Sequence, residues 1–209
     1  MKFLRLLILA AIVLACASSS FSQQPPPCAL KQAPEFNGFH LGMTALDVKD
    51  KIADTDLFDS KMSAVNKIGA QAVEILGSEL KDEYAEGIDS VNLTFVDKRL
   101  AVIKATYNSA ITWRNAQDFF KQVSEKLGLP QNSPSSATRG TRGNEKFRFE
   151  CTNFAVTLAY SFGVSPSVTI ANTEAQRLVD ERSEKNPDGQ IKTINVTPTM
   201  RPPRPNPPR

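Results

Sequence analysis

The stretch Ser90–Tyr107 constrains the fold more than any other part of the chain, because it has the pattern of a β-hairpin. Apolar and polar residues alternate over 91–95, which is the period of a strand with one buried face. A polar corner at Asp97-Lys98 follows, and a second apolar run begins at Leu100. The pattern predicts two antiparallel strands, and therefore a sheet with a core.

The register of this hairpin follows from its apolar residues. A loop of even length places Phe95 opposite Leu100 and Leu93 opposite Val102, so that one face is wholly apolar. Because Asp-Lys lacks the glycine that a tight type I′ turn prefers, we favour a four-residue loop, Val96–Arg99. The second strand then also carries small and apolar residues on its other face, which indicates a central strand: Ala101, Ile103 and Ala105.

The segments before the hairpin predict a helix and a strand. Thr44 is a good N-cap, and Asp47 three residues later suits a capping box. Gln71–Leu76 has the composition of a short strand. Residues 54–69 are ambiguous. Asp54, Asp56 and Asp59 invite a calcium-site interpretation, but the positions where an EF-hand loop needs glycine and glutamate hold Asp59 and Val65, so a solvated helix end and loop is favoured.

The second half repeats this order of elements. Thr112 or Asn115 caps an amphipathic helix that ends at Gly128, the C′ position of a Schellman-type ending. Three short strands follow, and a capping box at Thr173–Gln176 starts a last helix that runs to about Lys185. The predicted strands are Phe147–Cys151, Phe154–Tyr160 and Val168–Ala171, with a two-residue turn that sets Cys151 beside Phe154.

These elements predict an α+β fold. We expect two helix-plus-antiparallel-meander units in one domain, with helices packed on one face of the sheet, and a C-terminal helix. The recurrence suggests an internal duplication over 38–108 and 112–172. The expected organisation is a signal peptide at 1–22, a Pro-rich linker at 23–35, a globular domain at 36–186 and a disordered Pro/Arg-rich tail at 187–209.

The N-terminus has the features of an export signal. Lys2 and Arg5 precede the apolar run Leu6–Ala15, which is too short to span a bilayer. Cleavage after Ser22, or alternatively after Ala17, gives a periplasmic or secreted protein. The alternative is an outer-membrane lipoprotein anchored through Cys16, because residues 13–16 resemble a lipobox.

Cys28 and Cys151 are the cysteines that follow this signal. An even pair in an exported protein predicts a disulfide bond between them. The formal net charge of +3 for the whole chain leaves a nearly neutral body once the signal and the basic tail are set aside. This argues against nucleic acid as a partner.

No catalytic constellation can be built from the sequence. His40 is the single histidine, and no serine or cysteine lies in a recognisable nucleophile motif. One histidine and two paired cysteines cannot form a zinc site, so we expect no metal, no cofactor and no enzyme activity. Anion or partner contacts are instead expected from arginines of a polar loop and of the tail: Arg139, Arg142, Arg201, Arg204 and Arg209.

Leu41-Gly42-Met43-Thr44 followed by Val48 resembles the helix start of the BamE (SmpA/OmlA) group of small outer-membrane lipoproteins and of the similarly built β-lactamase-inhibitor proteins. The resemblance implies an exported, non-catalytic protein made of helix-plus-sheet units for protein–protein contact. It covers little more than a dozen residues and the order of elements, and it carries over no functional residue.

The leading hypothesis is therefore a non-catalytic exported protein of a bacterial envelope that binds another protein or an envelope component. The first alternative is a carrier of a small ligand in a cavity between helices and sheet. The second alternative is a hydrolase that acts on cell-wall polymers.

Overall fold

The computed structural model describes Cys28 and residues 30–62, 69–130, 136–139, 144–161 and 163–185. The predicted signal peptide, Cys16 and the predicted tail lie outside these residues. The helices are α2 (Ala45–Lys49), α3 (Thr55–Met62), the 3₁₀ turn η1 (Gly77–Glu79), α4 (Asp82–Ala85), α5 (Ala116–Lys126) and α6 (Thr173–Lys185). The strands are β1 (Ala70–Leu76), β2 (Ile88–Val96), β3 (Arg99–Tyr107), β4 (Ser136–Arg139), β5 (Glu145–Glu150), β6 (Phe154–Ser161) and β7 (Val164–Asn172).

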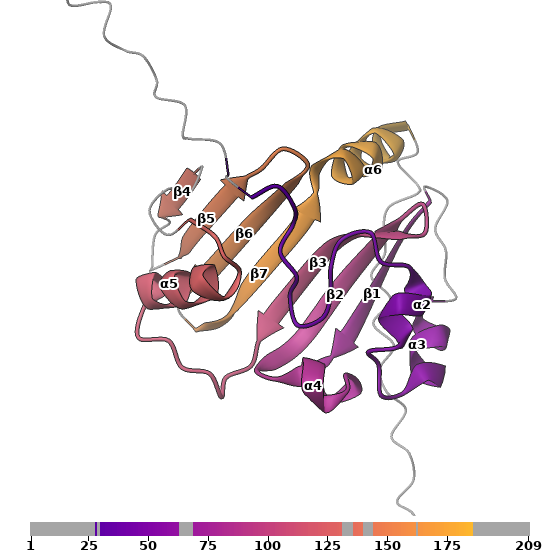
Figure 1. Ribbon diagram of the computed structural model, residues 1–209, viewed down its shortest axis with the longest axis horizontal. Coiled ribbons are helices and arrows are strands. Elements are labelled where there is room, and N and C mark those ends of the chain that lie inside the picture. Colours follow the sequence, from indigo (N-terminus) through magenta and orange to yellow (C-terminus); the bar gives the residue numbers. More distant parts are fainter. Residues whose placement is uncertain are drawn as a thin grey trace, which may run out of the picture.

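The strands form one seven-stranded sheet in the order β1-β2-β3-β7-β6-β5-β4, and every pair of neighbours is antiparallel (Figure 1). The meanders β1-β2-β3 and β5-β6-β7 therefore meet through their third strands. This contact pairs Val102 with Ala171 and Thr106 with Ser167. The predicted α+β class, with helix-plus-meander units and a C-terminal helix, is confirmed.

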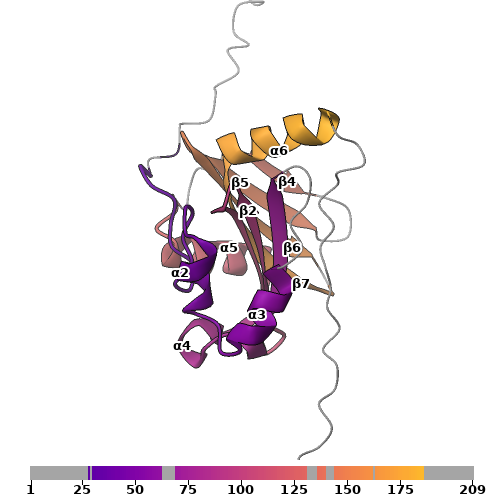
Figure 2. The ribbon, with the colours of Figure 1, turned by 90° about the vertical axis from the view of Figure 1, so that its right-hand side faces the viewer.

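The two faces of the sheet are covered unequally. Helices α2, α4 and α5 and the N-terminal segment 30–43 lie over one face, α3 flanks the edge strand β1, and α6 lies on the opposite side (Figure 2). The covered face holds the main core, with Leu93, Phe119, Leu158 and Ile170 fully buried. This burial of apolar side chains is the main favourable contribution to folding.

The tip of the β2–β3 hairpin differs from the prediction. Val96 pairs with Arg99, so the loop has two residues and not four. Asp97 and Lys98 both have positive φ, 49° and 65°, which is the geometry of a type I′ turn. The predicted pairing of Phe95 with Leu100 is confirmed, because both loop lengths are even.

A β-bulge after Leu100 also changes the predicted faces of β3. Leu93 pairs with Ile103 and not with Val102, because one extra residue of β3 is inserted between the pairs Phe95–Leu100 and Thr94–Val102. Ile103 and Ala105 therefore belong to the main core, whereas Val102 turns to the other face. The expected central position of β3 is confirmed, since it lies between β2 and β7.

The helix ends largely follow the expected signals. The side chains and backbones of Thr44 and Asp47 form both bonds of a capping box. Gly128 has a φ of 65°, and the Leu129 amide donates to the Ser124 carbonyl over 2.8 Å, as a Schellman ending requires. At α6 the N-cap is Asn172 and not Thr173, because the Asn172 side chain accepts from the Ala175 amide.

The N-terminal segment crosses the core face of both meanders (Figure 1). Phe36 and Phe39 pair through a bridge and are almost fully buried. The Gly42 amide and the Met43 carbonyl each bond Leu100 at 2.8 Å. At the other end of the segment, the Sγ atoms of Cys28 and Cys151 are bonded at 2.02 Å. The segment is thus fixed to the hairpin at one end and to the β5–β6 turn at the other.

Candidate functional sites

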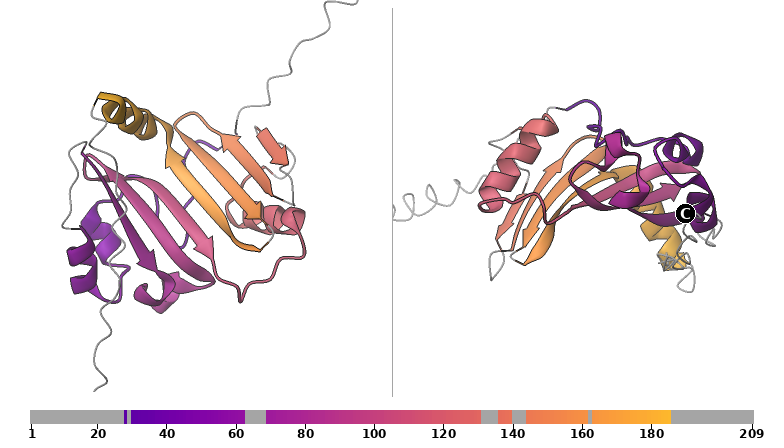
Figure 3. Two further views of the ribbon diagram at one scale, coloured as in Figure 1. Left: turned by 180° about the vertical axis from the view of Figure 1, so that it is seen from behind. Right: turned by 90° about the horizontal axis from the view of Figure 1, so that it is seen from below.

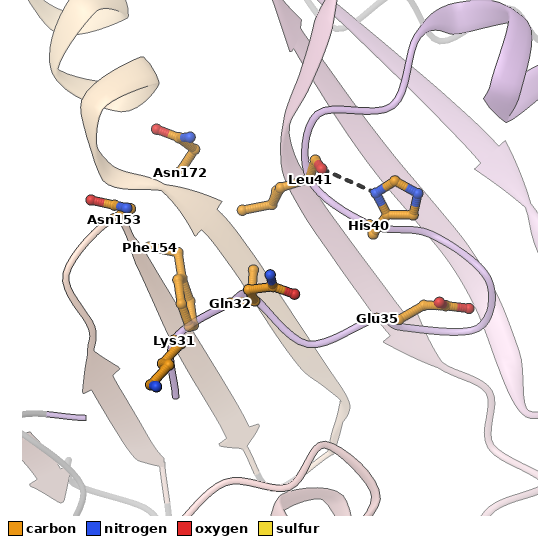
Figure 4. A pocket seen from close by; sticks show the side chains of 9 residues that line it. Lys31, Gln32, Glu35, His40, Leu41, Asn153, Phe154 and Asn172 are labelled. Atoms are coloured by element: carbon orange, nitrogen blue, oxygen red, sulfur yellow. Dashed lines mark hydrogen bonds between the residues drawn. The ribbon is translucent and has the colours of Figure 1, made fainter. Parts of the chain in front are cut away.

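His40 lies at a polar cleft of about 520 Å³ between the N-terminal segment and the ends of β6 and β7 (Figure 4). The imidazole Nδ1 is 3.1 Å from the Leu41 carbonyl oxygen, and the side chain is exposed. The residues that line the cleft are Lys31, Gln32, Ala33, Glu35, His40, Leu41, Asn153, Phe154 and Asn172. Lys31, His40 and Asn153 are exposed, so the cleft is an open surface depression.

The cleft does not supply the groups of a nucleophilic triad. Its lining holds no serine, threonine or cysteine beside His40, and Glu35 is its only carboxylate. Among the residues that the structure describes, no group of three or more histidine, cysteine, aspartate or glutamate side chains is placed to hold a metal ion. The cleft is therefore a polar depression that holds one histidine and one carboxylate.

Of the arginines expected to contact a partner, Arg139 alone lies within the described residues. Arg139 is the last residue of β4, and the structure describes its backbone alone. Arg142 of the same loop lies outside the described residues, as do Arg201, Arg204 and Arg209 of the tail. These predictions are neither supported nor opposed by the fold.

The face of the sheet opposite the main core is the most extensive surface with a distinct composition. Seen from behind, α6 is the described helix that lies over the strands, and it lies at one end of them (Figure 3, left). The register aligns its side chains in three rows across the strands. We call these residues the open face: Ala72, Glu74, Ser90, Asn92, Thr94, Val102, Lys104, Thr106, Lys146, Arg148, Glu150, Ala155, Thr157, Ala159, Ser167, Thr169 and Ala171.

Short side chains dominate the open face. One row reads Asn92, Lys104, Thr169, Thr157 and Arg148 across five neighbouring strands. Most members are half-buried, as expected where neighbouring side chains pack beside them and, away from α6, no described element packs above. The middle of this face is a layer of mostly hydroxyl, amide and methyl groups, and the exposed Leu76, which pairs with Ser90, is a large apolar side chain at its edge.

Helix α6 is docked on this side by a small second core. Val179 and Ala175 pack against Ala70, Val96 and Ala101. Beyond that core, the Arg182 guanidinium donates two bonds of 2.9 Å to the Asp97 carboxylate at the hairpin turn. These hydrogen bonds, together with the opposite charge, lower the pKa of Asp97 and raise that of Arg182.

A groove of about 450 Å³ runs between α6 and the strands; we call it the α6 groove. Its floor consists of threonine, alanine and valine side chains of the open face, and its rim is charged. The lining residues are Val102, Lys146, Arg148, Ala155, Thr157, Thr169, Ala171, Thr173, Gln176, Arg177 and Asp180.

The charged residues around the α6 groove differ in their partners. Arg177 is bonded to Glu174 and Glu181 on its own helix, and the Arg148 Nε donates to Glu150 over 2.9 Å. Lys146 has neither a hydrogen bond nor an ion pair within the described part of the chain. The same is true of Lys104, which lies in one row with Arg148 and is also exposed.

The junction between the halves is occupied by aromatic rings on the core side. Tyr107 contacts Trp113 at 5.7 Å and Phe119 at 5.9 Å in edge-to-face arrangements. Burial raises the pKa of the Tyr107 hydroxyl far above its usual value. Tyr107 thus belongs to the main core, and the half-buried Trp113 packs against it.

Sequence reasoning did not identify the open face as a site. Part of the signal was present, because Asn92, Thr94, Thr157 and Thr169 alternate with core residues. What could not be obtained from one sequence is the β3–β7 pairing, which places the polar faces of both meanders side by side.

Comparison with known proteins adds no relative: no protein-family model, curated protein or solved structure matches this chain. In the described ranges, no helix is long and apolar enough to cross a membrane. The bonded cysteine pair is compatible with an exported protein.

Proposed function

We propose that this protein is a non-catalytic exported protein of a bacterial envelope, and that it binds another protein through the open face. The observation that carries this proposal is the contrast between the two sheet faces. One face is covered by helices and by the N-terminal segment, whereas most of the other presents aligned short side chains to solvent. A pre-formed surface of this kind can bind a partner with little loss of conformational entropy.

The composition of the open face suits recognition better than burial within this chain. Threonine, serine and alanine side chains lose little rotamer freedom on binding, and their hydroxyl groups can donate and accept. Val102, Ala155 and Ala171 form a row that offers apolar area beside the polar rows. A protein surface offers this combination of polar and apolar contacts.

Export through residues 1–22 is part of the proposal, and the disulfide supports it. N-terminal sequencing of the mature protein tests it directly. A start at Gln23 supports secretion, and a blocked, acylated Cys16 supports the lipoprotein alternative. A mature chain that retains Met1 contradicts export through this segment.

Photo-crosslinking from the open face tests the binding function. Benzoylphenylalanine at Thr169, in the middle of the face, should give adducts with a partner in intact cells. The same probe at Lys121, which is exposed on α5 over the other side of the sheet, is the matched control. Adducts from position 121 and none from position 169 would overturn the proposal.

The two alternative functions receive less support. A carrier would need space between helices and sheet, but Phe119 and Tyr107 fill the region under α5 with ring contacts. A histidine-based hydrolase would need a partner for His40, whose ring nitrogen Nδ1 instead faces the Leu41 carbonyl.

A further inference from the structure

We propose that the α6 groove, with the adjoining Lys104, binds an acidic segment of the partner protein in an extended conformation. This inference rests on the proposed function, because it names the chemistry that the open face recognises. It is carried by three observations: the spacing of the cations, the absence of carboxylates between them, and the floor that separates them.

Two of the cations lie three strands apart in one row, and beyond Lys104 this row continues through Asn92 to Glu74. The register places Lys104 on β3, Thr169 on β7, Thr157 on β6 and Arg148 on β5. Three strand spacings of about 4.8 Å separate Lys104 from Arg148, which gives roughly 14 Å. Lys146 lies two residues from Arg148 on the same face of β5, so two cations face one across a floor of threonines.

Two of the three cations are not neutralised within the described part of the chain, whereas Arg148 is paired with Glu150. Lys104 and Lys146 are exposed and, among the described residues, have no acidic partner. Thr169 and Thr157 carry hydroxyl groups and no charge, so a bound carboxylate meets no repulsion above them. Asp180 is the one carboxylate in the lining of the α6 groove, and it accepts a bond from Gln176 on its own helix.

The spacing defines the segment that fits. An extended chain advances about 3.3–3.6 Å per residue, so roughly 14 Å corresponds to four residues. Acidic side chains at positions i and i+4 of an extended segment would therefore reach Lys104 at one end and Arg148 with Lys146 at the other. A segment that crosses the strands in this way lies directly over Thr169 and Thr157.

The floor favours a polypeptide over an anionic polymer such as a polyphosphate. The row beside the threonines consists of Val102, Ala171 and Ala155, which offers apolar contact along the same path. The small residues between two acids of a peptide can bury their methyl groups there. A phosphate chain has no group to place on this row.

A peptide-binding measurement with the mature full-length protein tests the inference. The probe is a fluorescein-labelled peptide with the central sequence Glu-Val-Ala-Val-Glu, and the control probe has both glutamates replaced by glutamine. We expect the acidic probe to bind at least about tenfold more tightly, and its affinity to fall as the salt concentration rises. Equal binding of the two probes would overturn the inference.

Charge removal on the protein locates the site. Lys104→Gln and Lys146→Gln should each weaken binding of the acidic probe several-fold, whereas Lys121→Gln on α5 should leave it unchanged. Equal effects of all three substitutions would show only a general effect of net charge. This result would contradict binding of the acidic probe in the α6 groove. Tighter binding of polyphosphate than of the acidic peptide, lost in the same two variants, would assign the site to the polymer instead.

The two proposals fail in different ways. If the adducts from Thr169 persist in the Lys104→Gln/Lys146→Gln double variant, the open face binds its partner without the acidic contact, and only this inference is lost. If Thr169 gives no adduct in the unaltered protein while Lys121 does, both proposals fail.

Discussion

The Lys61 ammonium group lies 2.7 Å from a carboxylate oxygen of Glu79, and both side chains are largely buried. The same ammonium donates to the Glu74 carbonyl oxygen over 2.9 Å. Glu74 belongs to β1, the edge strand of the sheet. A charge directed at an edge strand in this way keeps other strands from pairing with it.

Loss of this lysine should therefore destabilise the protein strongly. Lys61→Met leaves the Glu79 carboxylate buried without its cation, and we expect a cost of about 3–5 kcal/mol in the free energy of unfolding. Urea denaturation measures this value. Lys49→Met is the matched control, because Lys49 pairs with an exposed Asp59 and should contribute less than about 1 kcal/mol. Similar losses in both variants would contradict the special role of Lys61.

Removal of the disulfide should also be costly. The cysteines are 123 residues apart, so the bond restricts a long loop of the unfolded chain and stabilises the fold by about 4–5 kcal/mol on the chain-entropy model. The Cys28→Ser/Cys151→Ser variant should lose this amount in denaturant unfolding. Reductant should lower the stability of the unaltered protein and leave the variant unchanged; an equal response of both would show that the bond is not responsible.

The Asp97–Arg182 contact should make the docking of α6 depend on pH. The bonds from Arg182 lower the pKa of Asp97 below its ordinary value of 3.8. The contact therefore stabilises the fold fully above pH 3.8, and this contribution is lost as the pH falls through the lower pKa of the folded state. The difference in denaturation midpoint between the unaltered protein and Asp97→Asn should shrink in that range.

The Arg182→Gln variant provides the control for this pair. It should lose as much as Asp97→Asn at neutral pH, and the double variant should lose no more than either single variant. Additive losses would indicate that the two side chains act separately.

The hairpin turn offers a stabilising substitution. Lys98 is exposed and has a φ of 65°, a conformation that costs a residue with a Cβ about 1 kcal/mol relative to glycine. Lys98→Gly should therefore raise the free energy of unfolding by roughly 0.5–1 kcal/mol. Lys98→Ala retains the Cβ and should change it little, so an equal gain from alanine would point to loss of the charge as the cause.

Local signals in the sequence were sufficient for much of the fold. Thr44 marks the start of a helix because its side chain accepts a hydrogen bond from the Asp47 amide. Gly128 marks the end of a helix because it adopts a positive φ. The structure places both as expected. The Phe95–Leu100 pair follows from the alternation of apolar residues alone. Such features depend on residues that are close in the chain, so one sequence contains the information.

Features that depend on distant parts of the chain were not predictable in the same way. The bulge beside Leu100 coincides with its bonds to Gly42 and Met43, which belong to the N-terminal segment. Lys61 lies in a segment without a clear pattern, and its role appears only when α3 meets β1. The α6 groove requires the β3–β7 pairing, which no local signal specifies.

The β3–β7 pairing also determines how this chain can be divided. A cut in the connection between Tyr107 and α5, followed by separation of the fragments, would expose one new strand edge in each, β3 in the first and β7 in the second. These edges are complementary, so separately produced fragments should reassemble into one sheet, with the Cys28–Cys151 bond available to seal the product covalently. The protein is thus suited to use as a split reporter whose halves lock together after they meet.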